Sequence, residues 1–261
     1  MSDATHPQPD QITPSAVSTS RLKLLAPVWH TVALVVFLFA FSALGYIGTR
    51  RLIHTGPNAA APSPMRMLPT YLGTLLFEWV IFFFVYWGEK RYSGATLRER
   101  IGGRWASARD VWRDIGLGFS LWIAASILNA ASNSVLHPSG TKTVLKLLPH
   151  VAWQLIPWVL ISASAGFCEE YVFRGYLMEQ LRRMTGVAWL AIVLQALIFG
   201  IGHGYQGLAL MFSIFLLGLA FGVAANSLKS LRPCMIAHGV TDTFGGVAGY
   251  FINAYHLVKI L

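Results

Sequence analysis

Residues 30–48 read HTVALVVFLFAFSALGYIG, residues 208–225 read LALMFSIFLLGLAFGVAA, and each run is long enough to cross a bilayer as a helix. A transmembrane helix needs about 20 mostly apolar residues, whereas a barrel strand needs about 10 residues of alternating polarity. Both runs are continuously apolar, so they predict helices. Comparable runs recur along the chain, and the sequence therefore predicts an all-α, polytopic transmembrane helix bundle.

Composition supports a membrane location. Of the 261 residues 55% are hydrophobic and only 12% are charged, whereas soluble domains carry about 25% charged residues. The net charge of +9 is typical of a membrane protein whose basic loops meet anionic lipid. We therefore expect membrane lipid, and no nucleic acid, as a partner.

Hydropathy divides the chain into three parts: a tail at 1–25 that is rich in Pro, Ser, Thr and Gln and is expected to be disordered, two spans with an interfacial segment at 26–110, and a core at 111–257. The segment 89–114 places arginines beside tryptophans, which is typical of an amphipathic helix lying at the lipid headgroups. About seven spans are predicted in all, at 27–48, 68–88, 111–136, 151–180, 187–204, 207–228 and 233–257.

The basic residues predict the orientation of these spans. An N-terminus in the cytoplasm places 13 of the 20 lysines and arginines on the cytoplasmic side and six on the other side, with Arg174 inside a span. The positive-inside rule favours this arrangement. We also expect the mouth of any site to lie on the cytoplasmic side, near a tight hairpin at 182–186 and the basic segment 89–113.

Charged residues inside a span cost a few kcal/mol each and need a reason. The stretch FCEEYVFRGYL at 167–177 holds Glu169, Glu170 and Arg174. On a helix Glu170 and Arg174 share a face and can pair, while Glu169 is rotated about 100° away. One carboxylate is then neutralised and the other is unpaired within its own helix. The alternative is a buried ion-pair network that only holds helices together.

Two histidines follow in later spans. Glu169 precedes Gly186 of the hairpin by 17 residues and His203 follows it by 17, so an antiparallel helix pair brings them to similar depth. Phe199 lies one turn before His203 and is expected to pack the wall of the site. In the last span His238 and Asp242 share a helix face, where Asp242 can orient the imidazole or join it in binding.

These residue types fit peptide hydrolysis. A glutamate can take a proton from water, and histidines can stabilise an oxyanion or bind a metal. His203 and His238 with Glu169 would also suit a divalent metal such as zinc. A non-catalytic immunity or scaffold protein and an ion transporter are the competing hypotheses, and the lack of an internal repeat disfavours the transporter.

Three motifs in order carry a resemblance to a known family. EEYVFR at 169–174 matches EExxxR, FGIGH at 199–203 matches FxxxH, and HGVTD at 238–242 matches Hxxx(N/D). The chain thereby resembles, over about 110–257, the CAAX protease and bacteriocin-processing family of intramembrane proteases, which includes type II CAAX prenyl endopeptidases and abortive-infection-like proteins.

The resemblance implies an enzyme whose substrate is a membrane-associated or prenylated-type protein or peptide, in a multi-pass protein of the bacterial inner membrane type. It implies Glu169 as the residue that activates water, with His203, His238 and Asp242 as catalytic partners. Glu170, Arg174 and Phe199 would support them. The family is described both as metalloproteases and as glutamate proteases, so a metal requirement stays open.

Glu78 lies outside every motif, in the middle of the span segment LLFEWVIFFF at 75–84. We expect it to be protonated or hydrogen-bonded to another helix, with a role in packing or in a cavity wall.

Overall fold

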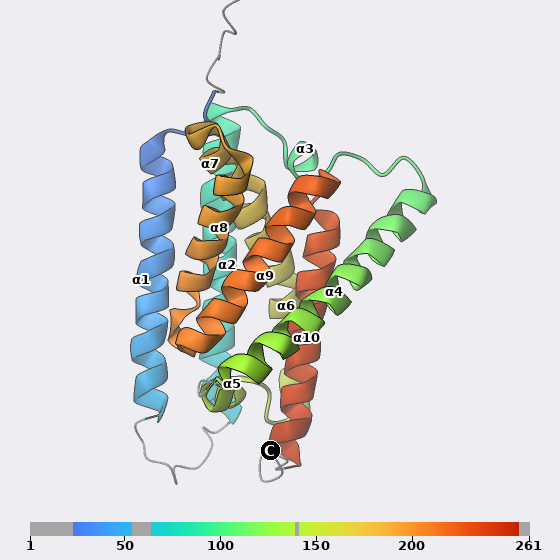
Figure 1. Cartoon of the computed structure of the whole chain (residues 1–261). Coiled ribbons are helices and arrows are strands. Elements are labelled where there is room, and N and C mark those ends of the chain that lie inside the picture. Colours follow the sequence, from blue (N-terminus) through green and yellow to red (C-terminus); the bar gives the residue numbers. More distant parts are fainter. Residues whose placement is uncertain (1–22, 54–63, 139–140, 256–261) are drawn as a thin grey trace, which may run out of the picture.

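The computed structural model describes residues 23–53, 64–138 and 141–255, and within these ranges the chain forms helices without a strand (Figure 1). The all-α class is therefore confirmed. Most of the predicted tail lies outside the described residues. Its last residue, Leu25, is 1% exposed and donates its backbone N–H to the side chain of Gln180. The described end of the tail is thus packed into the core, so the expected disorder is wrong there.

In the described ranges, seven long helical stretches build a bundle, joined by short helices at its two ends (Figure 1). The short elements are α3 (Leu97–Ile101), α5 (Thr141–Leu147), and the 3-10 turns η1 (Ala152–Gln154) and η3 (Gly204–Gln206). The long ones are α1 (Val28–Ile53), α2 (Pro64–Tyr92), α4 (Ala108–Leu136), α6 (Leu155–Glu170) continued by the π-helix η2 (Tyr171–Leu177) and α7 (Met178–Thr185), α8 (Ala188–Gly202), α9 (Leu208–Leu228) and α10 (Arg232–Ala254).

Four helices among the described residues are long and apolar enough to cross a membrane: Val28–Gly48, Met67–Tyr92, Ala108–Leu136 and Leu208–Leu228. Ala188–Gly202 is apolar but shorter. The predicted span at 151–180 is helical from Leu155 on but changes from α to π geometry after Glu170. The predicted span at 233–257 is helical as far as Ala254 and carries polar site residues. A multi-pass membrane protein is supported, and the number seven is not confirmed.

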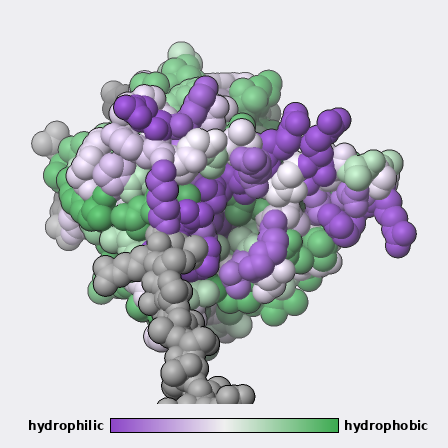
Figure 2. Space-filling model, turned by 90° about the horizontal axis from the view of Figure 1, so that it is seen from above, coloured by the Kyte–Doolittle hydropathy of each residue, from purple (hydrophilic) through white to green (hydrophobic). Residues whose placement is uncertain are grey.

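The basic segment between α2 and α4 differs from the predicted interfacial helix. It holds only the five-residue α3, which begins with a capping box of Thr96 and Glu99 and ends at the left-handed Gly102. A second capping box, of Ser107 and Asp110, starts α4 directly afterwards. These start and stop signals break the segment into short pieces. Hydrophilic side chains nevertheless gather at this end of the bundle (Figure 2). Trp112, in the first turns of α4, is 71% exposed.

Small residues bring α6 and α10 into close contact. A Cβ on Gly166 would lie 2.6 Å from the carbonyl oxygen of Met235 and 2.8 Å from the backbone nitrogen of Gly239. Only glycine fits at 166, because the obstacle is backbone. This approach, of the kind that small residues allow between membrane helices, places the end of α6 beside the first turns of α10.

The start of α1 is fastened to the segment that follows the carboxylate pair. His30 is fully buried, and its Nδ1 lies 2.9 Å from the hydroxyl of Tyr176 in η2. Gln180 of α7 accepts from the N–H of Leu25 and donates to the carbonyl of Ala26, each at 2.8 Å. These contacts satisfy backbone groups at the entry to α1, where a helix leaves its N–H groups unpaired.

Replacing Gly88 by alanine should destabilise the protein by about 1–3 kcal/mol, as overpacking of a core does. A Cβ at 88 would lie 2.2 Å from Nε2 of His30. That ring cannot move aside, because it stacks on Phe84 with centroids 4.1 Å apart and bonds to Tyr176. Thermal unfolding in detergent measures the effect.

Gly73→Ala is the matched control in the same helix, since a Cβ there meets nothing within 4 Å among the described residues. It should leave stability unchanged or raise it, because alanine favours a helix over glycine by about 1 kcal/mol. Equal unfolding temperatures for the two variants would contradict the packing of His30 against α2.

Candidate active site

The two neighbouring carboxylates, Glu169 and Glu170, have different surroundings, as the helical spacing predicts. Glu170 and Arg174 form an ion pair at 2.9 Å, with both side chains fully buried. The guanidinium group of Arg174 also lies over the ring of Phe199, 4.4 Å from its centroid, and faces Phe221 at 5.5 Å. Burying a charge requires a partner, and here a carboxylate and two aromatic faces supply it.

The helix changes from α to π geometry directly after Glu170. Tyr171–Leu177 is a π-helix, and all seven of its residues are buried. Within it Tyr171 contacts α2, Arg174 faces α8 and α9, and Tyr176 contacts α1. Short π segments frequently occur at functional sites. This one lets a single stretch hold three sets of neighbours, and the spacing in the sequence gave no signal of it.

His238 of α10 lies among three carboxylates. Its Nδ1 donates to Oε1 of Glu170 at 2.8 Å. Its Nε2 lies 3.5 Å from Oδ2 of Asp242 and 3.8 Å from Oε2 of Glu169. The first and third motifs are therefore brought together, with one ring nitrogen held by Glu170 and the other directed to Glu169 and Asp242.

His203 caps the end of α8, and its Nδ1 lies 2.9 Å from the carbonyl oxygen of Phe199. That carbonyl accepts the Nδ1 proton, which leaves Nε2 of His203 free to accept or, when protonated, to donate. The rings of Phe199 and His203 are 4.8 Å apart, so Phe199 forms the wall as expected. His203 and Glu169 line the same cavity and interact electrostatically, as their equal spacing from Gly186 predicts.

This cavity has a volume of about 680 Å³ and lies between α1, α2, α5, α6 and α8. Glu78, Glu169 and His203 line it together, and most of the remaining wall is apolar. On one side Phe41 of α1 stacks on Phe77 of α2, with ring centroids 3.5 Å apart. The site is thus a small polar group in a largely apolar chamber.

The cavity does not extend toward the expected mouth. Its lining on α1 and α2 comes from residues 38–48 and 69–81, and it reaches α5 at the end of the bundle opposite α3 and α7 (Figure 1). None of its lining residues comes from 182–186 or 89–113. The prediction of a mouth beside those segments is therefore wrong for this cavity.

Contacts of the basic segment explain why that end is closed. The carbonyl of Ile101 accepts the N–H of Leu231, which ties α3 to the turn before α10. The guanidinium of Arg232 lies 4.4 Å from the centroid of the Trp105 ring and pairs with Asp114 at 3.4 Å. The segment is packed onto the bundle as a cap.

The site residues do not gather as a metal centre. His203 and His238 keep Nε2 available, and hydrogen bonds at the other ring nitrogen are common in zinc ligands. Within the described ranges, however, no three His, Cys, Asp or Glu side chains converge as metal ligands. The tentative metal ligands His203, His238 and Glu169 stay a prediction, and we derive no step through a metal.

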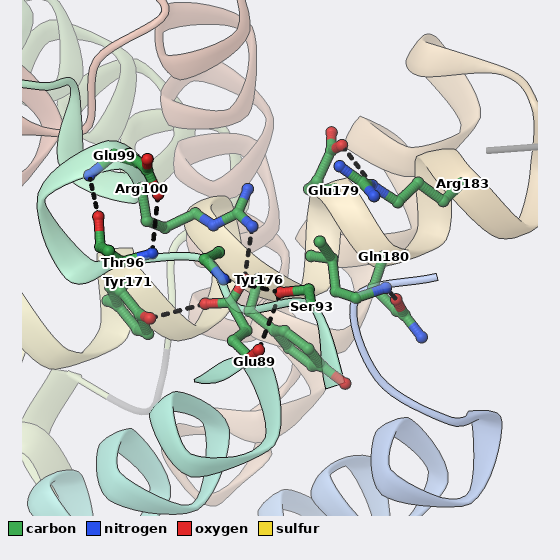
Figure 3. Close-up of polar contacts among 12 residues, drawn as sticks. Glu89, Ser93, Thr96, Glu99, Arg100, Tyr171, Tyr176, Glu179, Gln180 and Arg183 are labelled. Carbon is green, nitrogen blue, oxygen red and sulfur yellow. Dashed lines mark hydrogen bonds and ion pairs between the residues drawn. The ribbon is translucent and has the colours of Figure 1, made fainter. Parts of the chain in front are cut away.

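A buried ion pair beside the site was missed in the sequence (Figure 3). Glu89 is 0% exposed, and its carboxylate lies 2.6 Å both from the guanidinium of Arg100 and from the hydroxyl of Tyr171. The pair fastens α3 to the first residue of the π-helix. A signal did exist, because 78, 81, 82, 85 and 89 follow the spacing of one helix face, and all five are buried.

Residues 151–244 match a family model described as type II CAAX prenyl endopeptidase Rce1-like. The matched segment contains all three motifs, so the resemblance read from them is confirmed there. The match shows similarity to this family over residues 151–244. Several apolar helices among the described residues support a multi-pass membrane protein. Searches of curated proteins and of solved structures gave no match.

Proposed function

We propose that the chain is an intramembrane endopeptidase that hydrolyses a peptide bond of a membrane-associated or prenylated-type protein. The observation that carries this is the state of Glu169. Its Oε2 is buried without a hydrogen-bond partner in the described part of the chain, in the wall of a cavity that it shares with His203. Glu170 is paired with Arg174, so Glu169 is the carboxylate left to act on water.

The proposed reaction uses this chain's own groups. Glu169 takes a proton from a water molecule, whose oxygen attacks the peptide carbonyl carbon. The resulting oxyanion accepts a hydrogen bond from the Nε2–H of His203 or His238 in its protonated form, since Nδ1 of each ring is already bonded. Collapse breaks the C–N bond, and Glu169 returns the proton to the leaving amine. Asp242 and Glu170 hold the ring of His238 in place.

The shape of the cavity supports the substrate class. A peptide bond would lie beside Glu169 and His203, and an apolar chain attached to the same substrate would lie against the apolar wall of the cavity. Burying such a chain contributes about 25 cal/mol for each Å² of apolar surface. A lipid-modified peptide suits this combination better than a polar one.

The test is cleavage by the purified chain in lipid nanodiscs of an S-farnesyl peptide that ends in a CaaX sequence, with products identified by mass spectrometry. We expect cleavage by the natural sequence and none by Glu169→Gln. We also expect cleavage to survive 1,10-phenanthroline. Loss of activity with the chelator and its return with zinc would restore the metal hypothesis. A natural sequence no more active than Glu169→Gln would favour the scaffold hypothesis.

We propose that the N-terminus is cytoplasmic, and cysteine labelling tests it. Lys229 is exposed at the α3 end of the bundle, and Ser134 is exposed at the α5 end. In intact cells an impermeant maleimide should label Ser134→Cys and spare Lys229→Cys, while both react after lysis. Native Cys168 and Cys234 are fully buried, so background is low. The reverse pattern would overturn the orientation.

A further inference from the structure

One carboxyl group in the cavity has no part in the proposed reaction. Glu78 lies in the middle of α2 and is 2% exposed, yet it lines the cavity beside Glu169 and His203. The hydroxyl of Ser164 in α6 is close enough to its carboxyl group to interact with it as a hydrogen-bond donor. The expectations of a contact with another helix and of a place in the cavity wall are therefore confirmed.

The contact with Ser164 uses only part of the carboxyl group. Oε2 of Glu78 is buried and lacks a hydrogen-bond partner among the described residues. A buried polar atom without a partner costs about 1–3 kcal/mol. A contact that links α2 to α6 through Glu78 and Ser164, called the pin below, needs only one acceptor oxygen. A purely structural role therefore does not explain the second oxygen of Glu78.

The position of the free oxygen relates it to the reaction. Glu78 interacts electrostatically with Glu169, Asp242 and His238, and the interaction with Glu169 is the largest of the three. Glu78 therefore lies within the electric field of the proposed site. Its neighbours on α2 toward the α5 end, such as Thr74 and Gly73, line the same chamber. A peptide bound in this cavity with its scissile bond at Glu169 therefore lies close to Glu78, because both glutamates line the cavity.

From this geometry we infer that Glu78 is a substrate-binding residue, and the inference rests on the proposed function. Its free oxygen forms a hydrogen bond with a main-chain N–H of the peptide next to the scissile bond. An N–H inside a helix is already bonded to a carbonyl four residues earlier. The inference therefore specifies the substrate class further: the segment that enters the site is extended or unwound, with an attached apolar chain.

Binding measured without turnover tests the inference. Titration of the S-farnesyl CaaX peptide into Glu169→Gln, and into the double variant with Glu78→Gln, should show about tenfold weaker binding for the double variant, equal to about 1.4 kcal/mol. Glutamine keeps an acceptor for Ser164 but has none left for the peptide. With the active chain, Glu78→Gln should raise KM and leave kcat and the unfolding temperature nearly unchanged.

A series of peptides, each methylated at one backbone nitrogen, removes the proposed hydrogen bond from the peptide side, as Glu78→Gln removes it from the protein side. At the nitrogen that contacts Glu78, methylation should weaken binding to Glu169→Gln but cost little more in the double variant, because the hydrogen bond is already lost. Ser164→Ala is the structural control, since it removes the pin between α2 and α6, and it should leave peptide affinity unchanged.

Three results would overturn the inference: equal affinity with and without Glu78→Gln, an equal loss in Ser164→Ala, or no measurable binding to Glu169→Gln. A kcat for Glu78→Gln as low as that of Glu169→Gln would also overturn it, because Glu78 would then take part in the chemistry. Failure of the proposed function has a different signature, namely a natural sequence that does not cleave more than Glu169→Gln.

Discussion

Glu169→Gln should lower the cleavage rate by about 10²- to 10⁴-fold, the usual contribution of a general base, with little change in thermal unfolding. The amide has nearly the same shape but cannot take a proton from water. Stability should hold because the structure gives Oε2 of Glu169 no hydrogen bond to lose within the described chain, and a neutral amide is cheaper to bury than a carboxylate. Initial rates and unfolding curves on one preparation measure both quantities.

Variants of His203 and Glu170 serve as controls for this result. His203→Gln should also slow cleavage while leaving the ion pair of Glu170 and Arg174 in place, because the side-chain hydrogen bond of His203 in the described part of the chain goes to the carbonyl of Phe199 in its own helix. If Glu169→Gln kept the natural rate while Glu170→Gln was stable and inactive, the two glutamates would have exchanged roles, with Glu170 as the base.

Glu170→Gln should have the opposite balance of effects: a loss of about 3–5 kcal/mol of stability, as when one partner of a buried ion pair is removed, together with loss of activity. The carboxylate holds Arg174 at 2.9 Å and His238 at 2.8 Å, and every one of these side chains is buried. The variant leaves a buried guanidinium without its counter-charge. Unfolding temperature and yield of folded protein in detergent measure the loss.

The double variant of Glu170→Gln with Arg174→Met separates the two functions of Glu170. Removing both charges should recover part of the stability, because apolar replacements of a buried pair are often neutral or stabilising. Activity should stay low, since His238 still lacks the carboxylate that accepts its Nδ1 proton. A Glu170→Gln protein as stable as the natural sequence would contradict the assignment of the pair.

Much of the site could be predicted because it depends on local helical spacing. The pairing of Glu170 with Arg174 follows from an interval of four residues, and the shared cavity of Glu169 and His203 follows from a symmetric hairpin. The turn at Gly186 is indeed left-handed, with φ of 75°. Such predictions need only the rise and rotation of a helix.

The remaining features depend on contacts between distant segments. The spacing of the motifs does not show toward which end of the bundle the cavity extends. That depends on whether Ile101 bonds to Leu231 and whether Arg232 meets Trp105, which join parts of the chain about 130 residues apart. Arg100 was interpreted as a headgroup contact for the same reason: its partner Glu89 is hidden on the buried face of α2.

The π-helix at Tyr171–Leu177 has a consequence for how the protein tolerates changes in length. A π turn accommodates one residue more than an α turn, and one residue corresponds to about 100° of helix rotation. This surplus sets the angular offset between the carboxylates of Glu169 and Glu170 on one side and the anchors Tyr176 and Gln180 on the other. The segment therefore fixes the rotation of the helix before it relative to the helix after it. Shortening it by one residue would turn the two glutamates away from α10, or turn Tyr176 and Gln180 away from α1, even with every functional side chain still present.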